Sequence, residues 1–175
     1  MNTTHRNRRR NKRSHRRGNI IVLSALLMVM MAAFVAFAVD LGSLYVARCE
    51  LQRAADSAAL SAAWDLVDEN ELKNATSVLS LESAARSSAV AFAARNKVLG
   101  CTPVVPVTDI KVGYLSDPTN PSSTMTFGST NSPNAVRVSV KRTTVQNGPI
   151  SFGFARVLGI FSEELEADAT AALLP

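Results

Sequence analysis

The first pattern along the chain is an uninterrupted apolar run. Residues 20–39 contain no charged side chain, and Ser24 carries their one hydroxyl group. About 20 apolar residues in a helix cross the roughly 30 Å hydrocarbon core of a bilayer. The run therefore predicts a transmembrane helix over residues 19–40. It exceeds the apolar region of a cleaved secretory signal, about 7–15 residues, so we expect it to be retained, although residues 37–39 (FAV) leave cleavage open.

The helical pattern continues beyond the apolar run. Between Asp40 and Trp64 there is no proline, and Gly42 is the one glycine. Apolar residues recur there at helical spacing and form one stripe: Leu41, Leu44, Tyr45, Leu51, Ala55, Ala58, Ala59 and Ala62. At 1.5 Å per residue a helix over 20–64 would be about 68 Å long. About half of it would stand outside the bilayer.

The outer half of this helix is rich in small residues, which permit close backbone approach. They are Ala47, Ala54, Ala55, Ala58, Ala59, Ser61, Ala62 and Ala63. Two interpretations are open. This face packs on the chain's own domain, or it packs on the helix of a neighbouring subunit. In the second case the candidate assembly contacts are Asp40, Gly42, Ala54, Ala55 and Ala58.

The remaining chain, residues 41–175, predicts one small α+β domain. Residues 65–74 are polar and predict a turn, residues 83–99 predict a second helix, and Gly100 predicts its end. Alternation of apolar and polar residues predicts strands over 109–115, 134–145 and 165–172. Residues 116–133 predict a long loop or open hairpin connection, and residues 149–159 a short strand or short helix. We expect a small antiparallel sheet packed against the helices.

Charge is concentrated at the N-terminus. Residues 1–17 hold eight of the 19 basic residues and no acid, which leaves 11 basic and 14 acidic residues elsewhere. Such a tail is typical of nucleic-acid binding or of the cytoplasmic side of a membrane span. The adjoining apolar run favours membrane orientation, and the tail (residues 1–18) has no aromatic residue for base stacking. We therefore expect contact with membrane lipid and not nucleic acid, with orientation set by Arg8, Arg9, Arg10, Arg13, Arg16 and Arg17.

Catalytic chemistry has little support in the sequence. His5 and His15 both lie in the tail, so the outer domain has no histidine for a Ser–His–Asp or Cys–His arrangement. Zinc-ligand spacing and phosphate-binding glycine loops are missing from the sequence. We predict no enzyme, cofactor or metal. The acidic residues Glu163, Glu164, Glu166 and Asp168 fit a solvated face better than a calcium site.

Three further residues keep alternatives open. Cys49 and Cys101 both follow the apolar run, on the predicted outer side where disulfides persist. They form a Cys49–Cys101 bridge or remain two free thiols, because sequence does not show proximity. Asp40 is either a boundary residue in the headgroup zone or a helix–helix contact to a neighbour's backbone or basic group.

Several segments together resemble a known family. They are Arg16-Arg17-Gly18, Val39-Asp40-Leu41-Gly42, Leu44-Tyr45 and residues 51–60 (LQRAADSAAL), followed by residues 94–96 (ARN), 134–138 (NAVRV), 154–159 (FARVLG) and 167–171 (ADATA). This set is similar to Tad-type (tight adherence, Flp) pilus-assembly proteins of the TadE/TadG kind. The resemblance covers most of residues 16–172.

The resemblance implies a single-pass bacterial envelope protein with a pilin-like layout. Its N-terminus would be cytoplasmic, the span would lie in the inner membrane, and the C-terminal domain would be periplasmic or extracellular. Expected partners are other pilus-assembly subunits, and a homo-oligomer is also open.

Larger relatives carry a von Willebrand A-type domain with a DxSxS metal loop, which this sequence lacks, so we expect a minimal member. Prepilin-type cleavage after Gly18 would place Leu23 at the fifth position of the mature chain, where type IV pilins carry Glu. The sequence therefore gives little support to prepilin-type processing. The alternative function is a ligand-binding or sensory module using loop 116–133.

Overall fold

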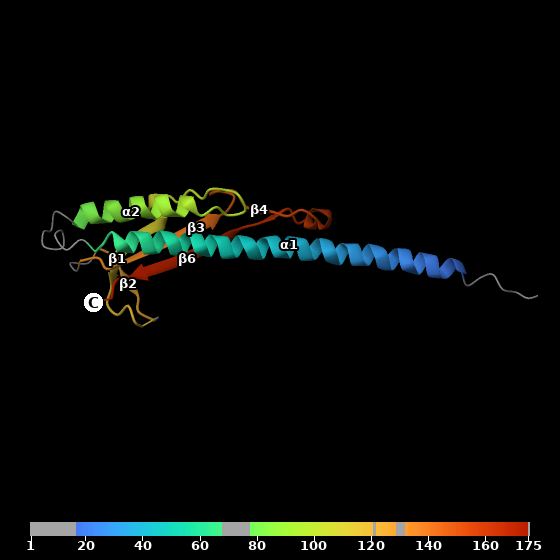
Figure 1. Ribbon diagram of the computed structural model, residues 1–175, viewed down its shortest axis with the longest axis horizontal. Coiled ribbons are helices and arrows are strands. Elements are labelled where there is room, and N and C mark those ends of the chain that lie inside the picture. The colour runs from blue at the N-terminus through green and yellow to red at the C-terminus, as the bar shows by residue number, and fades with distance from the viewer. Residues whose placement is uncertain (1–16, 68–77, 121, 129–131, 175) are drawn as a thin grey trace, which may run out of the picture.

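A computed structural model describes residues 17–67, 78–120, 122–128 and 132–174. Its longest element is helix α1 (Arg17–Trp64), which runs through the whole length of the molecule (Figure 1). The first part of α1 stands alone, and the second part is covered by the other elements. The prediction of one continuous helix through residue 64 is confirmed. It forms because neither proline nor a polar break interrupts residues 20–64.

Helix α2 (Val78–Arg95) runs back along the outer half of α1 (Figure 1). The sequence predicted a helix over residues 83–99. The structure confirms the helix, but both of its ends lie earlier in the chain than predicted. The helix begins at least five residues earlier and ends at Arg95. Beyond it, Leu99 and Gly100 both have positive φ angles, and Val98 and Cys101 exchange backbone hydrogen bonds of 2.8 and 3.0 Å. This tight turn replaces the last predicted helical turn.

The main sheet is antiparallel and has the strand order β2-β1-β3-β6. Its strands are β1 (Ile110–Leu115), β2 (Met125–Thr126), β3 (Ala135–Arg142) and β6 (Leu165–Ala172), and the short helix η1 (Val107–Asp109) precedes β1. Val138 pairs with Ile110 on one side and with Ala169 on the other. The three predicted strands are therefore present, and β6 has the predicted bounds. Loop 116–133 contains β2, which the sequence analysis did not resolve as a strand.

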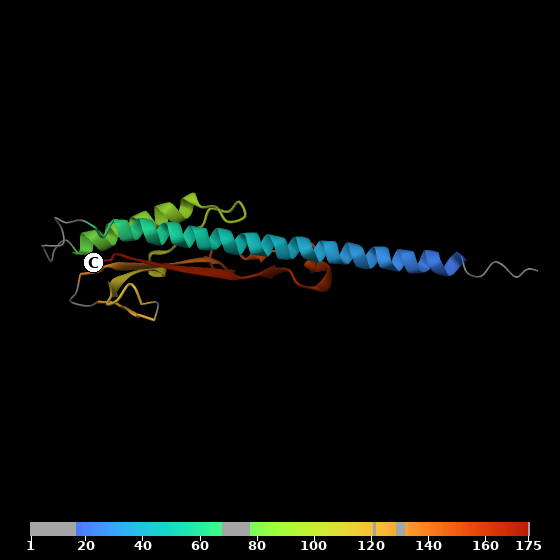
Figure 2. The same ribbon diagram turned by 60° about the horizontal axis from the view of Figure 1, so that its bottom comes forward.

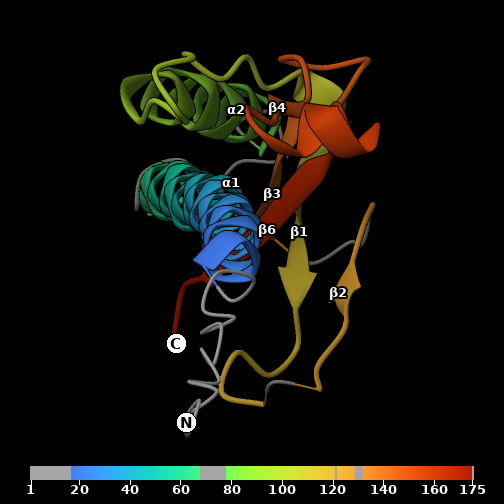
Figure 3. The same ribbon diagram turned by 90° about the vertical axis from the view of Figure 1, so that its right-hand side faces the viewer.

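Both helices lie on the same face of this sheet (Figures 2 and 3). The buried face of β3 carries Val136, Val138 and Val140, whereas Arg137 on the other face is exposed. These valines belong to one core with the alanines of α1 and α2. The predicted α+β fold, with a long N-terminal helix, a second helix and a small antiparallel sheet, is confirmed.

A second, smaller hairpin extends from the sheet toward the N-terminal part of α1 (Figure 1). It consists of β4 (Ile150–Ser151), the 3₁₀ helix η2 (Ala155–Leu158) and β5 (Ser162–Glu163), with Ile150 opposite Glu163. The sequence predicted either a strand or a short helix over 149–159, and the segment contains both. Gly159 ends η2 with φ +84°, a left-handed conformation that glycine adopts without steric cost.

Candidate functional site

The carboxylate of Asp40 joins α1 to the hairpin that carries η2. Its Oδ1 atom accepts a hydrogen bond from the backbone nitrogen of Gly153 at 2.9 Å. Its Oδ2 atom accepts bonds from the nitrogens of Phe154 at 3.0 Å and Ala155 at 2.6 Å. Asp40 is 5% exposed and is the one buried charged residue in the described part of the chain. Three backbone donors therefore stabilise a buried negative charge.

The local chain conformation explains why these donors converge. Successive backbone N–H groups at a turn point into a common concavity that binds an anion, and the start of a 3₁₀ helix leaves such groups free. A Cβ atom at Gly153 would lie 3.4 Å from Asp40 Oδ1, so the carboxylate packs closely on the backbone here. The Gly159 N–H bonds to the carbonyl oxygens of Ala155 and Arg156 and closes the far side of η2.

This contact brings the residue 152–161 segment, which we call the η2 loop, against the apolar part of α1. An apolar pocket of about 400 Å³ lies between the two elements. Val29, Ala33 and Phe37 line it from α1, and Phe154 and Leu158 line it from the η2 loop. Asp40 thus contacts a backbone, as one interpretation of the sequence expected, but the backbone belongs to its own chain.

The small residues of α1 face the interior of the domain. Ala54, Ala55 and Ala58 are fully buried in the core with α2 and the sheet. In the folded chain these residues therefore pack on the chain's own domain, the first of the two interpretations, and their role as assembly contacts stays a prediction. This packing arises because α2 and β6 occupy the space beside α1 that the small side chains leave. Gly42 differs, because it is exposed and a Cβ atom there would meet nothing within 4 Å.

The two cysteines are free thiols in the structure. Cys49 is exposed on α1, and Cys101 is half-buried in the turn after α2. Near Cys49, the Glu50 carboxylate accepts a 2.6 Å hydrogen bond from the backbone nitrogen of Leu99. The α1 helix and the turn at 98–101 are thus joined by this hydrogen bond without a disulfide. Of the arginines that we predict to set membrane orientation, those from Arg8 to Arg16 lie outside the described residues, and Arg17 begins α1.

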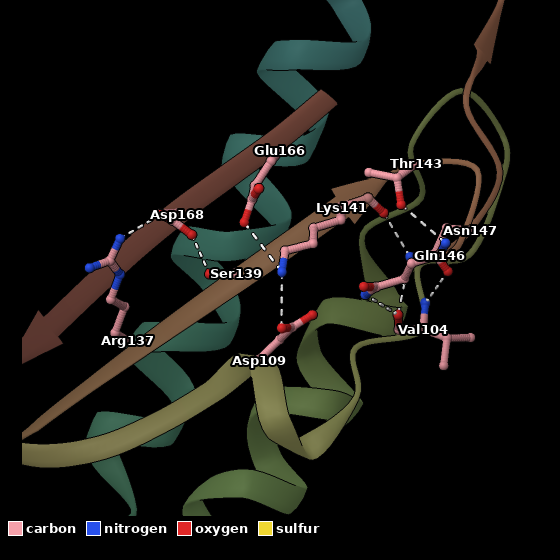
Figure 4. Close-up of polar contacts among 10 residues, drawn as sticks. All are labelled: Val104, Asp109, Arg137, Ser139, Lys141, Thr143, Gln146, Asn147, Glu166 and Asp168. Atoms are coloured by element: carbon pink, nitrogen blue, oxygen red, sulfur yellow. Dashed lines mark hydrogen bonds and ion pairs between the residues drawn. The ribbon is translucent and has the colours of Figure 1, made fainter. Parts of the chain in front are cut away.

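The outer face of the sheet carries a ladder of ion pairs (Figure 4). Asp168 on β6 bonds to Arg137 at 2.6 Å and also accepts a hydrogen bond from the Ser139 hydroxyl. The Ser139 hydrogen bond, and after it the Arg137 guanidinium, hold the pKa of the Asp168 carboxyl below its ordinary value. Lys141 lies 3.0 Å from Asp109 and 3.4 Å from Glu166. The hydrogen bond to Asp109 raises the pKa of Lys141.

These pairs account for most of the acidic cluster at the C-terminus. Glu166 and Asp168 face basic residues, and Glu164 accepts a 2.7 Å hydrogen bond from the Thr144 nitrogen. The hydrogen bond from the Thr144 hydroxyl, and after it the bond from the Thr144 nitrogen, lowers the pKa of Glu164. Among the residues that the structure describes, no group of three or more His, Cys, Asp or Glu side chains is arranged to hold a metal ion.

A turn that the sequence analysis did not single out joins two parts of the domain (Figure 4). The Asn147 side chain accepts a bond from the Val104 nitrogen at 2.8 Å and donates to the carbonyl oxygens of Val104 at 3.1 Å and Lys141 at 2.8 Å. Asn147 and Gly148 have positive φ angles of 63° and 70°. The dipeptide Asn-Gly is a strong turn signal and could have identified this site.

A surface groove lies beside loop 116–133. It has a volume of about 600 Å³ and mixed apolar and polar walls, which include Leu115, Pro118, Met125, Phe127 and Arg137. Its described lining residues include no His, Cys, Asp, Glu or Lys. Its position agrees with the segment that the sequence analysis assigned to ligand binding under the alternative function.

Two family descriptions match the chain and together cover almost all of it from residue 18 onward. Residues 18–65 match the family described as "Putative Flp pilus-assembly TadE/G-like". Residues 61–171 match the family described as "Putative Tad-like Flp pilus-assembly". The first match corresponds to α1, and the second to the domain that covers the outer half of α1. No curated protein and no solved structure matches the chain.

Proposed function

Because the chain belongs to the Tad-like Flp pilus-assembly family, we propose that it acts as a membrane-anchored structural or assembly subunit of a Tad-type pilus or secretion system. Other pilus-assembly subunits are its proposed partners. In this role the protein works through helix and domain contacts rather than catalysis. The absence of histidine outside the N-terminal tail is consistent with a non-catalytic role.

One observation supports the anchoring role above all others. The candidate span at the start of α1 has a mean hydropathy of 2.8, and none of that stretch is buried inside the molecule. Side chains such as Met28, which is 76% exposed, would cost free energy in water at roughly 25 cal/mol per Å² of apolar surface. Lipid removes this cost. We therefore assign residues 19–40 to the inner membrane and residues 41–175 to its outer side.

One continuous helix, α1, forms both the proposed anchor and part of the domain. The same helix that would cross the membrane supplies the central core element of the domain, so the domain cannot rotate freely relative to the span. Assembly contacts then form at defined positions along α1. Gly42 is the proposed contact, because an exposed glycine near the end of a span permits close approach of a second helix.

Deletion of the gene tests the assembly role. We expect loss of surface fibres in electron micrographs and their return with the wild-type gene. A variant with Leu27→Arg and Met28→Arg, which places two charges in the exposed apolar stretch, should leave the membrane fraction and fail to restore fibres. The matched change Leu60→Arg and Trp64→Arg alters exposed residues of the outer half and should remain membrane-bound. Normal fibres in the deletion strain would contradict the proposed function.

The exposed thiol of Cys49 tests topology. In a Cys101→Ala variant, Cys49 is the single cysteine of the chain. We expect it to react with a membrane-impermeant maleimide added to intact spheroplasts. Labelling that requires lysis would place the domain in the cytoplasm and contradict the assigned orientation.

The groove beside loop 116–133 favours a second candidate function, a single-pass envelope ligand-binding or sensory module. A Phe127→Ser variant removes an exposed aromatic wall of the groove. Under the assembly role, this variant forms normal fibres with unchanged gene expression. Altered gene expression that precedes any change in fibres would favour the sensory role.

A further inference from the structure

The η2 loop exposes an unusual amount of apolar surface. Phe154, Val157, Leu158, Ile160 and Phe161 each expose more than half of their surface, and Val157 is 89% exposed. These five residues lie within eight consecutive positions of the chain. Contiguous apolar patches of this kind on a protein mark contact with a membrane or another molecule.

The location of the loop indicates which contact it makes. The loop lies beside Val29, Ala33 and Phe37, which are part of the apolar run of α1. Val29 precedes Asp40 by 11 residues, which is about 16 Å along a helix. The hydrocarbon core is roughly 30 Å thick. When residues 19–40 cross the membrane, the loop therefore reaches well into the outer leaflet alongside the span.

The backbone of the loop is suited to this environment. Non-helical backbone inside a membrane must satisfy its N–H groups within the protein, because lipid offers no hydrogen-bond partners. Hydrogen bonds inside the chain, three of them to the Asp40 carboxylate, satisfy the N–H groups of Phe152, Gly153, Phe154, Ala155, Val157, Gly159 and Ile160. Asp40 thus supplies acceptors that water supplies to an ordinary surface loop.

Charge in the loop is compatible with the same location. Arg156 is the single charged residue between Phe152 and Phe161, and its side chain is exposed. A long arginine side chain in an apolar layer returns its guanidinium to the phosphate level. The two glutamates that follow lie between the loop and the main sheet, because Glu163 ends β5 and Glu164 directly precedes β6.

We propose that the η2 loop inserts into the outer leaflet beside α1, with its exposed apolar side chains in contact with lipid acyl chains. The chain then has two membrane contacts, the spanning helix and this loop, with the Asp40 carboxylate between them. Two contacts fix both the tilt and the rotation of the domain on the membrane. This proposal rests on the proposed anchoring of α1.

Depth-dependent fluorescence quenching tests the proposal with the full chain in vesicles of phosphatidylcholine and phosphatidylglycerol. Trp64 is the single tryptophan, lies at the outer end of α1 and is 76% exposed, so the wild-type chain is the aqueous control. Trp64→Phe combined with Met28→Trp reports the span. Trp64→Phe combined with Val157→Trp reports the loop. The quencher is phosphatidylcholine brominated along its acyl chains.

We expect the Val157→Trp chain to lose most of its fluorescence, as the Met28→Trp chain does, while the wild-type chain stays unquenched. Quenching of Met28→Trp without quenching of Val157→Trp would overturn the loop proposal and leave the anchor intact. Blue-shifted but unquenched Val157→Trp emission would overturn it in favour of a protein partner covering the loop. Failure of Met28→Trp to be quenched would overturn both the anchor and the loop.

Discussion

The Oδ2 atom of Asp40 lies 2.6 Å from the backbone nitrogen of Ala155, a residue 115 positions later in the chain. Asp40 marks the end of the apolar run, and Ala155 begins η2. The contact ties the apolar η2 loop to the C-terminal end of the proposed membrane span. It gives a physical role to a charge that from the sequence could be read as a boundary residue or as an assembly contact.

Removal of the Asp40 carboxylate should loosen the η2 loop. Asp40→Ala leaves three part-buried N–H groups without their carboxylate acceptor, and a hydrogen bond to a charged group contributes about 1.5–3 kcal/mol. Asp40→Asn keeps one acceptor oxygen but turns an NH2 group toward a donor, so we expect an intermediate effect. Hydrogen–deuterium exchange of the full chain in detergent should show faster exchange across 152–161 in both variants.

Asp56→Ala is the matched control for that experiment, because Asp56 is exposed on the same helix and its carboxylate bonds to Gln52. Exchange in the η2 loop should be unchanged in this variant. Unaltered exchange in Asp40→Ala would show that the carboxylate does not hold the loop.

The alanine face of α1 should not tolerate larger residues. Ala58 is fully buried, and Ala58→Leu forces extra volume between α1, α2 and the sheet, which costs about 1–3 kcal/mol or more. The same substitution at Ala91, an exposed position of α2, should change stability by less than about 0.5 kcal/mol. Thermal unfolding measures both. Equal stability of the two variants would contradict the observed core.

Acid should weaken the outer face of the sheet through Asp168. Its pKa is lowered in the folded state, mainly by the Ser139 hydroxyl. A carboxyl with a lowered pKa stabilises the fold above its unfolded pKa of about 3.9, and this contribution is lost as pH falls through the folded pKa. The unfolding free energy of the wild type should therefore fall more steeply below about pH 5 than that of Asp168→Asn.

Serine variants make this pH prediction specific. Ser139→Ala removes the main cause of the lowered pKa and should flatten the acid dependence in part. Ser83→Ala removes a comparable hydroxyl from α2, where it bonds to the Ser80 carbonyl, and should leave the pH profile unchanged. Denaturant titrations across pH 3–6 give the profiles. Identical slopes in the wild type and Asp168→Asn would rule out this linkage.

Substitutions at Gly42 should separate folding from assembly. Alanine is favoured over glycine within a helix by about 0.5–1 kcal/mol, and a Cβ atom at this position meets open space. Gly42→Ala should therefore raise the stability of the isolated chain slightly. Gly42→Leu should fold equally well but reduce fibre formation in cells, if a neighbouring helix packs there. Normal fibres with Gly42→Leu would remove Gly42 from the proposed assembly contacts.

Short-range pattern was sufficient to predict the largest elements of the fold. The apolar run and the stripe after it predicted α1, and strict alternation predicted β3 and β6, because burial of one face imposes the period of the secondary structure. The end of α2 was misjudged by about four residues. The positive φ of Leu99, which tightens the turn, has no signature in residue type.

The functional residues were identified less completely. Asp40 was singled out because it is a charge at the edge of an apolar run, yet its partners could not be named. The sequence predicts only a short strand or helix at the η2 loop, and the exposure of Val157 and Leu158 is visible only in the structure. The assignment of Ala54, Ala55 and Ala58 to either an internal or an external face was undecided, because a small residue fits both.

The apolar helix, its basic flank, the α+β character of the domain and the family resemblance could all be predicted from the order of the amino acids. All of these depend on composition and on spacing within a few residues. Three features became visible only in the folded chain: the alanine face is internal, Asp40 binds the backbone of residues 153–155, and the η2 loop lies beside the apolar run. The contacts of Asp40 and of the η2 loop join segments more than a hundred residues apart, and the alanine face is covered by both α2 and the distant strand β6.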